Sequence, residues 1–398
     1  MKYVIQRLKR FCGYLAGFVF FIGGLLKLVD PVGAGLVMDS YFDFLHLGFL
    51  SPAAKFFGVL FALVETVVGA GLITGVWRKV SGVIALSLQA FFTILTALLV
   101  IFKPEMDCGC FGEAVEMTHM QTFLKNLVLL ALLTAYVLPL KNIGKPKKKK
   151  YVSFGVVTVS VIAFMVYSCL YIPMVDLTDY KPGVQLQAGQ PDNQGDLYEA
   201  VFVYEKDGAR QDFDLDHLPD STWTFIEAQT KMREGVSERM PLSVMDADGQ
   251  YRDELAADGR VMMVSVYNTD VKPAFWKKAA EELRLVEQYG FTPVLLIAPS
   301  SEDVIPSLVE ADETAILKWM YYSDYKTIIT LNRSNGGLTY LNDGTIVRKW
   351  ARRAVPGEAE LKELSKSDSF ETEIDTITSR SLTFQGFLLY VFAIMLLL

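Results

Sequence analysis

The chain is organised around Asp107-Cys108-Gly109-Cys110-Phe111-Gly112, a stretch that stands between two long apolar runs, residues 80–102 and 122–140. It holds two of the four cysteines of the chain. Each flanking run approaches or exceeds the ~20 residues that a helix needs to cross a hydrocarbon core about 30 Å thick. The sequence therefore predicts a pair of thiols in a short loop at a membrane surface.

The composition also indicates a membrane protein. The 398 residues are 52% hydrophobic and carry a net charge of -7, and the mean hydropathy is positive. A single soluble domain does not have this composition. Further runs of spanning length cover residues 11–29, 53–76 and 151–172, and a shorter run covers 382–398 as a possible sixth span. The lipid bilayer is thus one expected partner.

Basic residues predict the orientation of these spans. Clusters precede the first span, separate the second from the third, and separate the fourth from the fifth: Lys2, Arg7, Lys9, Arg10; Arg78, Lys79; Lys141, Lys145 and Lys147 to Lys150. All three fall on one side, which is cytoplasmic by the positive-inside rule. The lysine-rich stretch is therefore an orientation signal that contacts anionic lipid, and we expect no nucleic-acid partner. The thiol loop and the long segment after residue 172 are expected on the outer, periplasmic side.

Three charged residues near or within the spans are candidate site residues. Glu65 lies near the middle of the second span, where an ionisable group is costly and must face the bundle interior. Lys27, or a polar group of span three (Gln89, Thr93 or Thr96), is a possible partner for it. Lys27 and Asp30 are three residues apart at the end of the first span. They either form an ion pair or act separately, as a snorkelling lysine and a capping aspartate.

Cys108 and Cys110 allow two chemistries. Two cysteines separated by one residue close only a small, strained disulfide, which is easily reduced, and Gly109 supplies the freedom that such a ring needs. Asp107 would raise the thiol pKa unless Lys103 or His119 offsets it. The alternative is a soft copper site in which Met117, His119 and Met120 join the two thiols. The spacing matches no strong structural zinc pattern, and inert buried thiols remain a third possibility.

The other two cysteines are weaker candidates. Cys169, near the outer end of span five, could resolve a mixed disulfide or could simply be a packing residue. Cys12 lies at the cytoplasmic end of span one, too far away to join the pair.

The N-terminal part resembles the DoxX/MauE family of four-helix membrane proteins. The likeness covers about residues 7–140 and rests on Gly23 to Pro31, on Glu65 with Gly69, on the Asp107 to Gly112 stretch and on Gln121 to Asn126. It implies a compact bundle related to membrane redox proteins. MauE-type members are associated with maturation of a disulfide-rich methylamine dehydrogenase subunit, and DoxX-type members with quinone-linked thiosulfate oxidation. The added fifth span and large C-terminal segment, similar to longer DoxX-type proteins of Bacteroidetes, mean that neither substrate can be carried over.

The segment after residue 172 is expected to be α/β. A Lys-Asp-Gly turn joins strands at 198–204 and 210–215, and a second hairpin surrounds residues 246–249. A strand (261–267), a helix (273–289), a strand (293–298), a helical stretch (301–320) and a hairpin (337–341, 345–350) then follow in the order of a thioredoxin-like fold. Residues 268–273 occupy the place of the thioredoxin Cys-x-x-Cys, but no cysteine follows Cys169. Binding a partner protein is the role left to this segment.

The predicted architecture is a four-helix DoxX/MauE-like bundle (1–140), a basic loop and fifth span (141–172), a hairpin-rich segment (173–250), a thioredoxin-like domain (251–360), a linker (361–381) and the terminal apolar run (382–398). The predicted protein lies in a bacterial inner membrane with a cytoplasmic N-terminus. Its expected function is thiol-disulfide or electron transfer by Cys108 and Cys110. Glu65, Lys27 and Asp30 are the assisting residues, and a quinone is the possible cofactor. Copper handling and a non-catalytic assembly scaffold are the alternatives.

Overall fold

A computed structural model of the chain consists of two compact units, one of residues 1–178 with 378–398 and one of residues 179–377. The residues that it describes are 2–104, 106, 108–113, 115, 117–138, 146–188, 198–206, 209–213, 219, 222–232, 240–298 and 304–398. Asp107, Lys141 and Lys145 lie outside this set.

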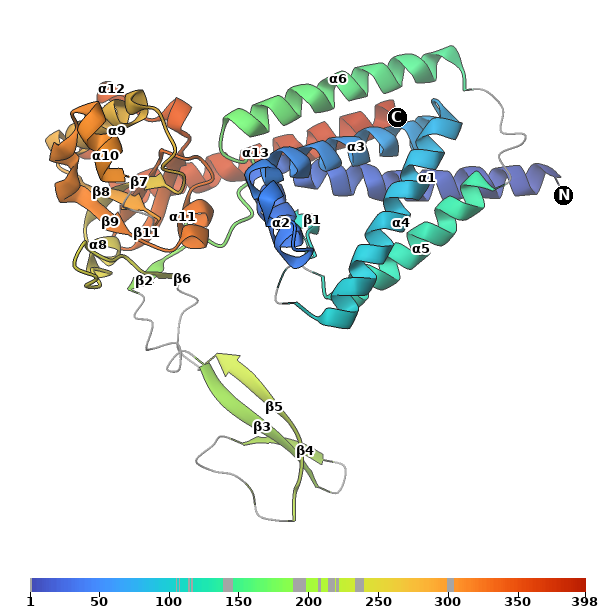
Figure 1. The fold of residues 1–398 in the computed structure, drawn as a ribbon, viewed down its shortest axis with the longest axis horizontal. Coiled ribbons are helices and arrows are strands. Elements are labelled where there is room, and N and C mark those ends of the chain that lie inside the picture. Colours follow the sequence, from blue (N-terminus) through green and yellow to red (C-terminus); the bar gives the residue numbers. More distant parts are fainter. Residues whose placement is uncertain are drawn as a thin grey trace. The chain divides into compact units, whose positions relative to one another are not determined.

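The first unit is a bundle of long apolar helices (Figure 1). Its helices are α1 (Lys2–Val29), α2 (Pro31–Phe44), α3 (Ala54–Thr74), α4 (Arg78–Phe102), α5 (His119–Val137), α6 (Lys148–Leu170) and the end of α13 (Ser369–Leu397), with a 3-10 turn, η1 (Gly48–Ala53), before α3. Within the described residues, six segments are long and apolar enough to cross a membrane: 6–29, 48–74, 78–102, 119–137, 148–170 and 371–397. The five full-length spans predicted from the sequence are therefore present as helices.

Small residues allow α1 and α3 to pack at short range. A Cβ atom added to Gly24 would lie 2.6 Å from the carbonyl oxygen of Ala62, and one added to Gly69 would lie 2.5 Å from the backbone nitrogen of Phe21. Close backbone approach through glycine is the usual way in which membrane helices gain packing contacts. This pairing fixes the position of Lys27 on α1 relative to Glu65 on α3.

Two connections contain helices that the sequence analysis did not predict. The connection between the first two spans contains α2, which Asp30 caps and which has Pro31 at its first turn. Residues 361–381, expected as a linker, are largely helical, because α12 (Glu358–Lys366) ends there and α13 begins at Ser369. The sequence did not indicate the start of α13, because the first turns of this helix are polar and it becomes apolar only further along.

The second unit contains a five-stranded mixed sheet. Its order is β11 (Thr345–Trp350), β10 (Gly337–Asn342), β7 (Arg260–Val266), β8 (Thr292–Ile297) and β9 (Met320–Tyr322). The strands β7, β8 and β9 are parallel, and β10 is antiparallel to both β7 and β11. The order of elements predicted for this domain is thus found, with β9 and the short helix α11 (Tyr325–Leu331) in addition.

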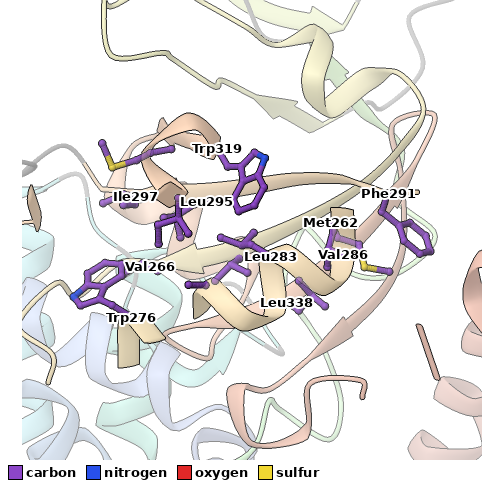
Figure 2. Close-up of a cluster of buried hydrophobic side chains, with 14 of the residues drawn as sticks. Met262, Val266, Trp276, Leu283, Val286, Phe291, Leu295, Ile297, Trp319 and Leu338 are labelled. Carbon is purple, nitrogen blue, oxygen red and sulfur yellow. The ribbon is translucent and has the colours of Figure 1, made fainter. Parts of the chain in front are cut away.

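Alternation along β7 divides the buried side chains between the two faces of the sheet. Met262, Val264 and Val266 belong to the core that lies under α9 (Pro273–Gln288), α10 (Val304–Ala311) and α12. Trp276 and Leu283 of α9 belong to the same core (Figure 2). Val261 and Met263 point to the other core, with Ile328 and Leu331 of α11. Strands buried on both faces are continuous apolar runs, which is why β7 and β8 were predictable from the sequence.

Smaller elements complete this unit. β3 (Tyr198–Lys206), β4 (Ala209–Phe213) and β5 (Thr224–Met232) form an antiparallel sheet that contains the first predicted hairpin. The second predicted hairpin is reduced to one bridge between Met245 and Tyr251, and β6 (Met240–Leu242) pairs with β2 (Leu186–Ala188) instead. The helical stretch predicted at 301–320 is divided into α10 and a 3-10 turn, η5 (Thr314–Trp319). The remaining pieces are α8 (Glu254–Ala257) and η6 (Arg352–Ala354).

Candidate functional site

A cavity of about 340 Å³ lies in one end of the helix bundle. It is enclosed by the second halves of α1 and α4, the first halves of α3 and α5, α2, and the turn that leads into β1 (Cys110–Glu113). Its walls are mostly apolar, with several phenylalanines. Its polar lining includes Lys27, Glu65, Cys108 and Cys110, which the sequence singled out. Residues up to 83 positions apart in the sequence (110 − 27) therefore meet around one cavity.

Lys27 and Glu65 form a buried ion pair in the wall of this cavity. The Lys27 Nζ to Glu65 Oε2 distance is 2.6 Å, and the two side chains are 16% and 10% exposed. Lys27 Nζ also lies 5.6 Å from the centroid of the Phe92 ring. Each charge compensates the other inside an apolar bundle, which is the condition for burying either. The pairing expected between Lys27 and Glu65 is present.

Asp30 has a different place. Its carboxylate Oδ1 accepts hydrogen bonds from the backbone N–H groups of Val32, at 3.1 Å, and Gly33, at 2.9 Å. It is thus the N-cap of α2, which is one of the two roles that the sequence left open.

The two cysteines lie in a tight turn on the cavity wall. Cys108 is buried, Cys110 is half-buried and begins β1, and both line the cavity. Gly109 between them has a φ of +58°, and Gly112 donates a backbone hydrogen bond of 3.3 Å to the Gly109 carbonyl. This left-handed conformation favours glycine, so the residue between the two thiols is fixed by the backbone of the turn.

Helix α2 holds the turn from one side. The Tyr41 hydroxyl donates a hydrogen bond of 3.1 Å to the carbonyl of Cys108. One helical turn earlier, Val37 packs so closely that a Cβ added to Gly109 would lie 2.2 Å from its Cγ1. Burial, and to a smaller extent the thiols of Cys110 and Cys108, raises the pKa of Tyr41. The phenol therefore stays protonated and remains a donor at physiological pH.

Polar side chains of α4 and α5 complete the wall. Asn126 Nδ2 donates to Thr96 Oγ1 at 3.2 Å, and Gln89 Nε2 donates to the Asn126 carbonyl at 3.2 Å. Lys125 Nζ lies 4.7 Å from the centroid of the Phe111 ring, beside Cys110. Sequence reasoning gave no role to Lys125 and Asn126. Their signal was two adjacent polar residues inside a predicted apolar span.

The residues of the alternative copper site are not gathered at the cavity. Met117, His119 and Met120 are absent from its described lining, although Cys108 and Cys110 belong to it. Over the described part of the chain, no group of three or more His, Cys, Asp or Glu side chains could hold a metal ion. The remaining cysteines are also elsewhere, because Cys169 is exposed near the end of α6 and Cys12 packs in a separate core with Tyr136.

In the α/β domain, the connection from β7 to α9 has no thiol and is filled by a side chain of the chain itself. Asn335 Oδ1 accepts hydrogen bonds from the backbone N–H groups of Tyr267 and Asn268, at 2.9 and 3.0 Å. Asn335 Nδ2 donates to the Asn268 carbonyl at 2.8 Å. These backbone groups at the end of β7 are therefore already satisfied.

Comparison with known proteins supports the assignment of the bundle. Residues 5–139 match the family model described as methylamine utilisation protein MauE. Residues 198–234 match a model described as a domain of unknown function, DUF8463. No curated protein and no solved structure matches the chain. The chain is therefore a multi-pass membrane protein whose residues 5–139 match the MauE family, and an α/β domain follows this bundle in the sequence.

Proposed function

We propose that the protein is a thiol-disulfide electron-transfer protein of a bacterial inner membrane. Cys108 and Cys110 cycle between dithiol and disulfide at the periplasmic end of the bundle. The observation that carries this proposal is that both cysteines line the same apolar cavity as the Lys27–Glu65 ion pair. A thiol pair of purely structural use has no need of a cavity, nor of two buried charges in its wall.

The chemistry of the cycle fixes what else must take part. When Cys108 and Cys110 form a disulfide, two S–H bonds break, one S–S bond forms, and two electrons and two protons leave. An acceptor of the quinone class takes up the same two electrons and two protons and becomes a quinol. Glu65 and Lys27 are the ionisable side chains in the cavity wall and would assist the transfer of these protons. The disulfide is re-reduced by the thiols of a substrate protein.

The basic residues support the orientation. Lys9, Arg10 and Arg78 lie at the start of α1 and of α4, the opposite end of these helices from the side chains that line the cavity. By the positive-inside rule, the cavity end of the bundle faces the periplasm, where disulfide chemistry proceeds.

The α/β domain would bind the partner or substrate protein. Its strand order, with β7 and β8 parallel and β10 and β11 antiparallel, supports a thioredoxin-like layout. It has no cysteine, and Asn335 occupies the backbone groups beside the start of α9. Disulfide exchange is therefore assigned to the membrane turn and recognition to this domain.

Thiol trapping tests the proposal. Cells that express the full chain are quenched with acid, and thiols are labelled with a mass-shifting maleimide before and after reduction. We expect Cys108 and Cys110 to be partly oxidised in cells and reduced after treatment with dithiothreitol. We also expect Cys110→Ser to accumulate a mixed disulfide with a second protein through Cys108, or Cys108→Ser to do so through Cys110.

Cys169→Ser is the matched control, since this cysteine lies on a membrane helix but away from the cavity. It should leave the oxidation state of the pair unchanged. Two cysteines that stay fully reduced in an oxidising periplasm would refute the redox function. A non-catalytic scaffold would then account for any loss of function seen on deletion of the protein.

A further inference from the structure

We propose that the end of the helix bundle opposite the cavity contains a binding site for a phosphate group, formed by Arg10, Arg78 and the hydroxyl of Tyr136. Its ligand is the headgroup of an anionic phospholipid. None of these three residues belongs to the described lining of the cavity. The site is therefore separate from the thiol pair and does not depend on the proposed function.

The first turn of α4 concentrates positive charge. Arg78 and Lys79 are its first two residues, and the turn contains no acidic residue. The N–H groups at the start of a helix carry a partial positive charge, which basic side chains reinforce instead of balancing. Trp77, the N-cap residue, makes no side-chain hydrogen bond to this turn. A bound anion would balance the charge, as anions do at the start of many helices.

A tight turn between α3 and α4 positions Arg78. Ser81 Oγ donates a hydrogen bond of 3.1 Å to the Val76 carbonyl, and Trp77 has a φ of +44°, which is uncommon for a bulky residue. The Arg78 side chain folds back over the end of α3, because a Cβ added to Gly75 would lie 2.5 Å from its Nε. The guanidinium is therefore held at the end of the bundle, where it is half-buried.

A buried hydroxyl beside Arg78 lacks an acceptor. Tyr136 on α5 is 4% exposed, and its ring lies 2.6 Å from a Cβ added to Gly13 of α1 and 3.2 Å from one added to Gly82 of α4. Among the described residues, its hydroxyl has no hydrogen-bond partner. The hydroxyl lies within electrostatic range of the Arg78 guanidinium, which offers only donors. A buried O–H group without an acceptor is costly, so a ligand oxygen is the acceptor that fits this place.

The helices that form this end of the bundle encode no carboxylate side chain as a counter-charge. Residues 1–29, 66–104, 117–175 and 382–398 contain no Asp or Glu. Arg10 on α1 acts electrostatically on Arg78, so two guanidinium groups lie near each other. Arg78 has further contacts within the chain, but none of these segments offers it an Asp or Glu. A phosphate can accept from both guanidinium groups and from the Tyr136 hydroxyl.

The surroundings favour a lipid as the source of this phosphate. Trp77 is 64% exposed, and its ring lies edge-on to that of Phe154 on α6, with 5.8 Å between the centroids. An exposed tryptophan at the end of a span is typical of the headgroup region of a bilayer. Phe11 and Val80, close to Arg10 and Arg78 in the sequence, are also exposed. The acyl chains of a bound lipid would cover such apolar side chains, whereas a soluble phosphate would not.

Only side-chain motion is needed for a phosphate to reach the buried hydroxyl. Arg10 is exposed and Arg78 is half-buried, and side chains at a surface change rotamer far more quickly than helices separate. When the Arg78 guanidinium turns toward a headgroup, the Tyr136 hydroxyl beside it can donate to the same phosphate.

Thermal unfolding of the full-length protein tests the site. The protein is delipidated in a maltoside detergent, and its melting temperature is measured while dioleoylphosphatidylglycerol is added. We expect this lipid to raise the melting temperature more than dioleoylphosphatidylcholine, because a ligand stabilises the folded state that binds it. Tyr136→Phe should weaken the apparent affinity for phosphatidylglycerol about tenfold, the equivalent of ~1.4 kcal/mol. Without lipid, this variant should be at least as stable as the wild type, since the hydroxyl that it removes has no described partner.

Two matched controls lie at the other ends of their helices. Lys103→Gln removes one positive charge at the C-terminal end of α4, and Tyr167→Phe removes the hydroxyl of a 42% exposed tyrosine near the end of α6. Both should bind phosphatidylglycerol as the wild type does, whereas Arg78→Gln should lose most of this binding. Tyr136→Phe keeps the packed ring, so its result holds even if Arg78→Gln does not fold.

Three results would overturn the inference. Equal affinity of Tyr136→Phe and the wild type would remove the hydroxyl from the site. Equal stabilisation by the two lipids would show that no anionic headgroup is recognised. Sodium phosphate that stabilises the lipid-free protein as strongly as phosphatidylglycerol would make a soluble anion the ligand. None of these measurements involves Cys108 or Cys110, so their failure leaves the proposed thiol chemistry untouched.

Discussion

The bundle and the α/β domain both bury a glutamate, but they stabilise it differently. Glu65 contacts Lys27 at 2.6 Å, and both side chains are almost fully enclosed. Glu282 on α9 is equally buried, yet its nearest ammonium, Lys278, lies at 3.5 Å and is 47% exposed. Burial raises the pKa of Glu282 to about 7, although Lys278 opposes the shift. The charge of Glu65 in the bundle is thus balanced by a buried lysine in direct contact, whereas the charge of Glu282 in the α/β domain is balanced only partly by a more exposed and more distant lysine.

A second contrast concerns the turns at the two sites. The Cys108–Cys110 turn borders a cavity, and both cysteines belong to its lining. The corresponding connection in the α/β domain is closed by Asn335, which satisfies its backbone groups. The two connections therefore differ in what they leave accessible, since the first lies on a cavity wall and the second has its backbone groups satisfied by Asn335.

The largest expected effect comes from breaking the compensated pair. Lys27→Met leaves the Glu65 carboxylate buried without its cation, which costs about 3–5 kcal/mol. Lys27→Met/Glu65→Met removes both charges and should recover most of this loss. Thermal unfolding of the purified protein in detergent measures both. Lys55→Met removes an exposed lysine of α3 and is the control. A Lys27→Met variant as stable as Lys55→Met would remove the basis of the comparison.

The next effect should come from Glu282, and it depends on pH. Because the folded pKa of about 7 lies above the unfolded value of 4.5, the folded state binds more protons between these values. The stability of the domain therefore falls as the pH rises from about 4.5 to about 7, by roughly 3 kcal/mol, and is level above that. Glu282→Gln should lose this slope and exceed the wild type at alkaline pH.

Denaturant midpoints, followed by the fluorescence of tryptophans such as Trp276 and Trp319, measure this slope. The control is Glu281→Gln, because Glu281 is the exposed neighbour of Glu282 on α9. Its stability should keep the pH dependence of the wild type. An unchanged slope in Glu282→Gln would show that the buried carboxyl is compensated after all, and the contrast with Glu65 would disappear.

Gly109→Ala tests how far the thiol turn depends on its backbone. A left-handed φ costs an alanine about 1–2 kcal/mol, and the added Cβ would also meet Val37 at 2.2 Å. We expect the turn to loosen and Cys108 to react faster with maleimide. Gly109→Ala/Val37→Ala should recover only the part due to the clash. Gly155→Ala is the control, since no atom lies within 4 Å of its Cβ position. Unchanged reactivity in Gly109→Ala would contradict a turn held by its glycine.

The sequence predicted those features of the bundle that depend on a local pattern of residues. Apolar runs of spanning length gave the helices, and lone charges in apolar spans gave Lys27 as one of several possible partners of Glu65. Sequence reasoning missed α2, because a short helix with two glycines between spans resembles a loop, although Asp30-Pro31 is a helix-start signal. Contacts such as Tyr41 to Cys108, 67 residues apart, leave no pattern in the chain. The same holds for Asn335, which acts through backbone groups far away in sequence.

The smallest effect should come from Tyr41, the contact between α2 and the thiol turn. Tyr41→Phe removes one hydrogen bond to the Cys108 carbonyl, worth about 1 kcal/mol. The melting temperature should change little, while Cys108 should react a few times faster with maleimide. Because the pKa of Tyr41 is raised by burial, the phenol stays protonated and this ratio should be constant between about pH 7 and about pH 10. Tyr14→Phe, a half-exposed tyrosine of α1 outside the described cavity wall, is the control. Equal reactivity in both variants would mean that packing by Val37 alone holds the turn.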